Sequence, residues 1–141
     1  MAAGVETRTV DRVTLWWHKT ELPGDLASAA LAREFVRVHL VEHGFPGLVE
    51  DLRLVTSELA TNAILHAQTT FTVTLHGDDE SVLLTVRDGS ALAPVRLLAQ
   101  VIGTGGRGLA IVAELSDRWG TTPNTDGGKS VWAWFDRHTL S

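Results

Sequence analysis

Three polar residues recur at four-residue intervals between residues 48 and 67, and their side chains could do chemistry. They are Glu58, Asn62 and His66. On a helix, this spacing places the side chains in one row about 12 Å long. A carboxylate can activate a hydroxyl group or water, and an amide oxygen can coordinate Mg²⁺. The row is therefore suited to a polyphosphate and its metal ion.

A solvated helix face is the alternative interpretation of this row. The helical wheel has a smaller apolar patch at Leu54 and Leu65 in addition to its main apolar arc, and Glu58 and Asn62 lie between the two. The main arc consists of Leu48, Leu52, Val55, Leu59, Ala63 and Ala67. A different set supplies the solvent side, namely Arg53, Ser57, Ala60 and Thr61. Because burying a bare carboxylate is costly, we expect Glu58 to open onto a cleft.

A glycine-rich segment, GTGGRG at residues 103–108, matches G-x-G-x-x-G by letter. A dinucleotide-binding fold needs this motif inside a strand–turn–helix unit, whereas here it leads toward an antiparallel hairpin, which argues against that fold. Glycines still let backbone N–H groups approach an anion at the start of the helix expected from Leu109, and Arg107 adds a charged donor. A flexible loop before an ordinary helix is the alternative.

A second pattern, HLVEH at residues 39–43, spells H-x-x-E-H, in which two histidines four residues apart can share a metal ion. The pattern lies at the very end of its predicted helix, beside Gly44, and no third ligand is apparent in the sequence. We therefore interpret it as a partly exposed helix end rather than a zinc site.

The elements that must position these residues follow from periodicity and turn signals. We expect helices over residues 26–43, 48–67 and 109–115, and strands over residues 13–17, 71–75, 82–86, 117–122 and 130–137. Residues 1–12 are polar and are expected to be loose. The core face of the first helix is expected to carry Leu31, Phe35, Val38 and Val41. This order predicts an α+β fold, a two-layer sandwich of a mixed, mostly antiparallel sheet with helices on one face.

Composition excludes several classes of function. The chain has 141 residues, a formal net charge of −5 and no cysteine, which argues against nucleic-acid binding, disulfides and cysteine metal sites. The first residues do not form a secretory signal, and no apolar run is long enough for a membrane span. We therefore expect a cytoplasmic protein.

Four segments in order resemble the sequence boxes of the GHKL (histidine kinase-like) ATPase superfamily. Residues 57–67 (SELATNAILHA) resemble the N box, and residues 86–90 (VRDGS) resemble a short first glycine box. Residues 105–112 (GGRGLAIV) resemble the second glycine box, and residues 128–132 (GKSVW) the last box. Within the superfamily, the chain looks most like the anti-sigma-factor serine kinases and small actinobacterial ATP-binding regulatory proteins. The resemblance implies a Bergerat-type ATP-binding fold over residues 23–137, preceded by a tail and first strand over residues 1–22.

The resemblance also implies roles for single residues. Asn62 would coordinate Mg²⁺ on the triphosphate, Glu58 would be the general base, and Asp88 would accept a hydrogen bond from the adenine amino group. Gly106 and Gly108 would let a lid wrap the phosphates. The remaining cofactor-binding positions by resemblance are His66, Arg107, Leu109, Lys129 and Ser130. The first glycine box is reduced, because Ser90 and Leu92 stand where the fuller family pattern has glycines.

By the same resemblance, the protein would bind Mg²⁺·ATP, restrain a sigma factor and phosphorylate a serine on an antagonist protein. Three other hypotheses stay open: a non-catalytic nucleotide-dependent binding module, a small ATP hydrolase, and a structural heterodimerisation domain. The strand over residues 13–17, with Trp16 and Trp17, is expected to be an exposed apolar edge. We expect it to pair at a homodimer interface or with a regulatory partner.

Overall fold

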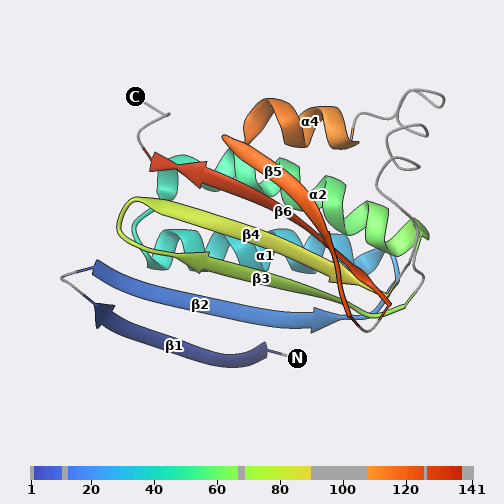
Figure 1. The fold of residues 1–141 in the computed structure, drawn as a ribbon, viewed down its shortest axis with the longest axis horizontal. Coiled ribbons are helices and arrows are strands. Elements are labelled where there is room, and N and C mark those ends of the chain that lie inside the picture. Colours follow the sequence, from blue (N-terminus) through green and yellow to red (C-terminus); the bar gives the residue numbers. More distant parts are fainter. Residues whose placement is uncertain (1, 11–12, 67–68, 90–107, 126, 138–141) are drawn as a thin grey trace.

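A single six-stranded sheet with helices on one face forms the protein (Figure 1). The computed structural model describes residues 2–10, 13–66, 69–89, 108–125 and 127–137. The strand order is β1-β2-β3-β4-β6-β5, and all five pairings between the described strands are antiparallel. The α+β two-layer prediction is confirmed, but the sheet of the described residues contains no parallel pair, so it is not mixed.

From residue 13 onward the elements agree closely with the expected ones, except that the strand expected over residues 13–17 continues to Leu22. The helices are α1 (Ala27–Glu42), α2 (Val49–His66) and α4 (Gly108–Leu115), and a short 3₁₀ helix, η1 (Pro46–Leu48), precedes α2. The strands are β1 (Ala2–Val10), β2 (Val13–Leu22), β3 (Phe71–Gly77), β4 (Ser81–Asp88), β5 (Arg118–Pro123) and β6 (Lys129–Asp136). No helix among these residues is long and apolar enough to cross a membrane.

The first strand, β1, corrects the expectation that residues 1–12 are loose. It pairs with β2 in a register that places Thr7 opposite Trp16 and Val10 opposite Val13. Because β2 also pairs with β3, it is an interior strand, and the predicted exposed edge at residues 13–17 is wrong. The physical reason is that an unpaired strand edge leaves backbone groups without partners, and residues 2–10 supply those partners despite their polar composition.

The core lies between the sheet and the helices. Alternate residues of β3, β4 and β6 are buried, as a one-sided sheet requires. The predicted core face of α1 is wrong at Leu31, Val38 and Val41, which are exposed, whereas the fourth predicted residue, Phe35, packs against the core. The buried residues of α1 are instead Ser28, Ala32, Val36 and Leu40. The small side chains at the start of this stripe let α1 lie close to its neighbours.

Helix α2 is buried over a wider face than its apolar residues predict. The buried positions are Leu52, Val55, Thr56, Leu59, Ala60, Ala63 and Ile64. Ala60 was expected on the solvent side, whereas Leu54 and Leu65, expected in a second apolar patch, are exposed. The reason is that α2 packs against α1, α4 and the sheet at once, so small and polar residues are buried between helices.

Candidate functional site

The residues singled out from the sequence lie on four elements that meet at one end of the molecule. The C-terminal ends of α2 and β4, the start of β6 and the N-terminus of α4 all lie at the right-hand end of Figure 1. Antiparallel pairing of β4 with β6 places Asp88 opposite Lys129. Helix α2 packs against both α4 and β4, and Asn62 lies in the last two turns of this helix.

Asp88 and Lys129 form a buried ion pair at the edge of this site. The Nζ of Lys129 lies 3.0 Å from Oδ2 and 3.2 Å from Oδ1 of Asp88. The side chains are only 5% and 6% exposed, so each charge depends on the other for compensation. Gly128 lies directly against the backbone here, because a Cβ on it would overlap the carbonyl oxygen of Asp88. The last box therefore contacts the end of the first glycine box.

Glu58 and Asn62 lie one turn apart on α2, and both are half-buried. Their neighbours Leu59 and Ala63 are buried in the core, which fixes the rotation of the helix. The Nδ2 atom of Asn62 is buried and has no hydrogen-bond partner among the described residues. A buried amide donor without a partner is costly, so this atom is available to a ligand that brings an acceptor.

The other predicted site residues lie partly outside the described residues. Gly106 and Arg107, with the rest of the GTGGRG segment before residue 108, fall there. His66 is the last residue of α2, but its side chain is not among those that the structure describes. Gly108 is the first residue of α4, and the buried side chain of Leu109 anchors this helix N-terminus to the protein.

The side chain of Ser130 lies on the other face of the sheet from that of Lys129, although Ser130 and Asp88 both line one hollow. Residues of β6 alternate, and Lys129 is on the buried, helix-facing side, so Ser130 is on the opposite face of the sheet. There its hydroxyl donates to Oδ1 of Asn124, at 3.3 Å. Trp132 and Trp134 share this face and line a hollow together with Leu83.

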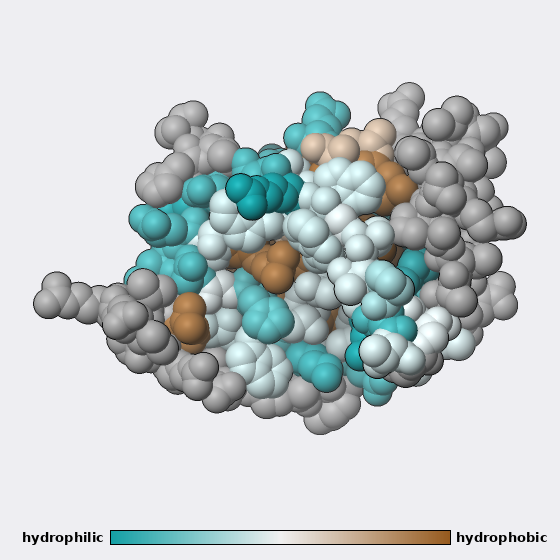
Figure 2. Space-filling view, in the orientation of Figure 1, coloured by the Kyte–Doolittle hydropathy of each residue, from teal (hydrophilic) through white to brown (hydrophobic). Residues whose placement is uncertain are grey.

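Figure 2 shows this helix-free face of the sheet. Its hydrophobic colour forms separate spots rather than one continuous patch. Arg118 lies over the ring of Trp134, with its guanidinium carbon 5.5 Å from the ring centroid. The hollows on this face are lined by residues of the sheet and its loops, and neither Glu58 nor Asn62 is among them. Asp88, Gly128 and Ser130 border one of these hollows, whereas Glu58 and Asn62 lie on helix α2.

Comparison with known families agrees with the arrangement of these elements. The model of the histidine kinase-like ATPase domain matches residues 22–135, which include α2, the end of β4, α4 and β6. No curated protein gave a match to the chain. The family match identifies an ATP-binding regulatory domain.

Proposed function

Since the chain belongs to the histidine kinase-like ATPase domain family, we propose that it is an anti-sigma-factor serine kinase. In this proposal it binds Mg²⁺·ATP, restrains a sigma factor and phosphorylates a serine on an antagonist protein. The observation that carries the proposal is the arrangement of Asn62 and Asp88. Helix α2 carries a buried amide nitrogen that has no partner among the described residues, and β4 carries a buried carboxylate; the two elements end at the same end of the fold.

Asp88 is the proposed acceptor for the adenine amino group. Its burial supports this role, because a hydrogen bond to a buried carboxylate is stronger than one to an exposed carboxylate. The Nζ of Lys129 donates to both oxygens of this carboxylate and so fixes its orientation. A carboxylate has about four lone-pair sites, so it can accept hydrogen bonds from Lys129 and from the adenine amino group at once.

Asn62 is the proposed ligand for Mg²⁺, through Oδ1. Amide and carboxylate oxygens are the ligands that Mg²⁺ prefers, and an amide adds no negative charge beside the phosphates. The unpartnered Nδ2 can then donate to a phosphate oxygen. The residues present therefore fit a triphosphate with its metal ion. When bound, Mg²⁺ would offset the negative charge of the phosphates.

Glu58 is the proposed general base. It lies one helical turn before Asn62 on the same helix, so a serine hydroxyl held at Glu58 would lie beside the γ-phosphate. Glu58 would take the hydroxyl proton while the serine oxygen bonds to the γ-phosphorus. The bond from that phosphorus to the bridging oxygen breaks, and ADP leaves with the oxygen.

A non-catalytic, nucleotide-dependent binding module is the second candidate. The reduced first glycine box, with Ser90 and Leu92 at the glycine positions, favours it. A third arrangement, hydrolysis of ATP without a protein substrate, uses the same groups with water in place of serine.

Phosphate transfer separates these candidates. The protein is incubated with γ-labelled ATP, Mg²⁺ and candidate antagonist proteins, and both protein-bound label and free phosphate are measured. Label on an antagonist serine supports the kinase. Release of phosphate without labelling supports the hydrolase. Nucleotide binding without either reaction, across all antagonists tested, overturns the kinase and supports the binding module.

A further inference from the structure

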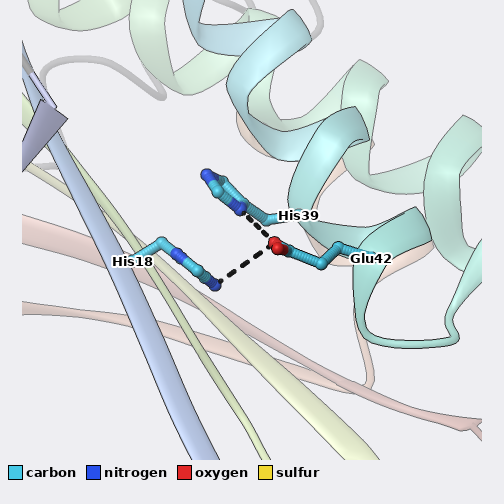
Figure 3. A group of neighbouring side chains, drawn as sticks. All are labelled: His18, His39 and Glu42. Atoms are coloured by element: carbon cyan, nitrogen blue, oxygen red, sulfur yellow. Dashed lines mark hydrogen bonds and ion pairs between the residues drawn. The ribbon is translucent and has the colours of Figure 1, made fainter. Parts of the chain in front are cut away.

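The H-x-x-E-H segment acquires a third metal-ligating side chain from another element. His39 and Glu42 lie in the last turn of α1, and His18 lies on β2. Figure 3 shows the imidazoles of His18 and His39 converging on the carboxylate of Glu42. The ligand atoms of these three residues all lie within 4.8 Å of one another. The sequence pattern lacks this third side chain because it comes from β2, the strand before α1.

The carboxylate oxygen Oε1 of Glu42 is the centre of the group. It lies 2.8 Å from Nδ1 of His39 and 3.7 Å from Nε2 of His18. Nε2 of His43 lies 3.9 Å from the same oxygen and 2.8 Å from Nε2 of His18. Of the three distances to Oε1, only the one from His39 is short enough for a hydrogen bond.

Neighbouring aromatic rings fix the imidazoles in place. His18 and His39 stack with their ring centroids 3.6 Å apart. Trp16 stacks on His43 at 4.0 Å, and Phe35 meets the ring of His39 edge-on at 4.8 Å. Packing therefore restricts the movement of these rings before any ion arrives.

Burial is unequal across the group. The His18 side chain is 3% exposed, whereas that of Glu42 is 55% exposed. The inner ligand is therefore shielded, and the outer ligand leaves an entry path for an ion from solvent.

We propose that His18, His39 and Glu42 bind one divalent transition-metal ion, with Zn²⁺ as the best fit. Zinc takes imidazole nitrogen and carboxylate oxygen at about 2.0–2.2 Å, which sets neighbouring ligand atoms of a tetrahedral site roughly 3.3 Å apart. The distances of 2.8 and 3.7 Å from Oε1 to the two imidazoles fall on either side of this value. One imidazole must rotate out of the His18–His39 stack for both ring nitrogens to face the same ion.

Binding the ion redistributes protons within the group. Nδ1 of His39 must be free of its proton to bind, so the neutral ring carries its proton on Nε2 instead. His43 is adjacent to the site and can fill the fourth position, which otherwise goes to water.

The site would join β2 to the C-terminal end of α1, two elements separated by a turn in the chain. It uses none of the residues proposed for ATP. The inference therefore stands independently of the proposed function, and its test needs no nucleotide.

Zinc titration of the untagged full chain, after chelator treatment and dialysis, tests the proposal. Isothermal calorimetry should show one Zn²⁺ per chain, and the thermal unfolding midpoint should rise with Zn²⁺ concentration. Glu42→Ala and His18→Ala should each weaken the affinity by at least ~10-fold. Glu42 is largely exposed, so its variant is expected to fold even where His18→Ala does not.

Two matched controls lie outside the group. Glu34→Ala removes another exposed carboxylate from α1, one that pairs with Arg37 three residues later. His76→Ala removes an exposed histidine from β3. Both should retain wild-type zinc affinity. The proposal is overturned by the absence of stoichiometric Zn²⁺ binding to the wild-type chain. It is equally overturned by unchanged affinity in Glu42→Ala, because the cluster would then be a hydrogen-bonded helix end without metal.

Discussion

The two charges of the Asp88–Lys129 pair are almost completely removed from water, and this determines how each residue can be tested. Asp88→Asn removes one charge and leaves the Lys129 ammonium buried without its partner. We expect a loss of roughly 3–5 kcal/mol in the free energy of unfolding, measured by urea denaturation.

The double variant Asp88→Asn/Lys129→Met is the control for this prediction. It removes both charges, so most of the lost stability should return. If it is as unstable as the single variant, the pair is not the cause. The double variant also provides a folded protein in which the joint contribution of Asp88 and Lys129 to ATP affinity can be measured.

Asn62 offers a change that should affect binding without affecting folding. Asn62→Ala removes the proposed Mg²⁺ ligand, and it also removes a buried amide nitrogen that has no described partner. We expect Mg²⁺-dependent ATP binding to weaken by ~1–3 kcal/mol or more, with little change in stability. Calorimetric titration with ATP, with and without Mg²⁺, measures this. Unchanged Mg²⁺·ATP affinity would reject the assignment.

A substitution at Glu58 is expected to change the turnover rate without changing ATP binding. Glu58→Gln keeps the size and hydrogen-bonding capacity of the side chain but removes the base. ATP binding should persist, while turnover should fall ~10²–10⁴-fold. Single-turnover kinetics of the variant and wild type, at saturating ATP, report this change. Full turnover in Glu58→Gln would mean that another group takes the proton.

At the scale of elements, the junction between β4 and β6 depends on a glycine. A Cβ on Gly128 would overlap the carbonyl oxygen of Asp88, and this oxygen belongs to backbone, which cannot move aside cheaply. Gly128→Ala should therefore push the two strand ends apart, lower the thermal midpoint and weaken ATP binding. Differential scanning calorimetry and ATP titration are the measurements.

Gly89→Ala is the matched comparison for this junction. A Cβ on Gly89 would lie 3.4 Å from the hydroxyl oxygen of Thr69, an ordinary contact with a side chain that can adjust. Its thermal midpoint should stay near that of the wild type. Equal destabilisation by both substitutions would show that loss of glycine flexibility, rather than the close approach at Gly128, is responsible.

At the scale of the whole molecule, β1 forms one outer edge of the sheet and covers β2. A chain that starts at Val13 would leave the backbone of β2 unpaired along one side. Such an edge pairs readily with another chain, so we expect dimers or aggregates in light scattering. A truncated chain that stays monomeric at high concentration would show that β2 does not need its cover.

The proposed function also requires surfaces that bind partner proteins. Binding of a sigma factor and of an antagonist, and a homodimer, are suggested by the resemblance to anti-sigma-factor kinases. Because β2 is interior, a homodimer formed by strand pairing would have to use β1 or β5, the outer strands of the described sheet.

Local patterns in the sequence were sufficient for much of this protein. Helix and strand positions from residue 13 onward, the α+β class and the ATPase family all follow from features that span a few residues. Periodicity reports which residues share one face of a helix or strand, and box motifs report local backbone chemistry. The polar row of Glu58 and Asn62 on α2 was found in this way.

Only the tertiary structure decided which of these faces meet. The pattern of α1 did not show that Ser28 and Ala32, rather than Leu31 and Val38, are buried, because a helix face is buried by its neighbours and not by its own hydrophobicity. The sequence likewise did not show that residues 2–10 pair with β2, since strand pairing depends on which edge of the sheet is free. The Asp88–Lys129 pair joins residues 41 positions apart, and the His18–His43 contact joins residues 25 apart. Such contacts arise from strand register and helix packing, so a zinc-type pattern that is incomplete along the chain gains its third ligand only when α1 packs against β2.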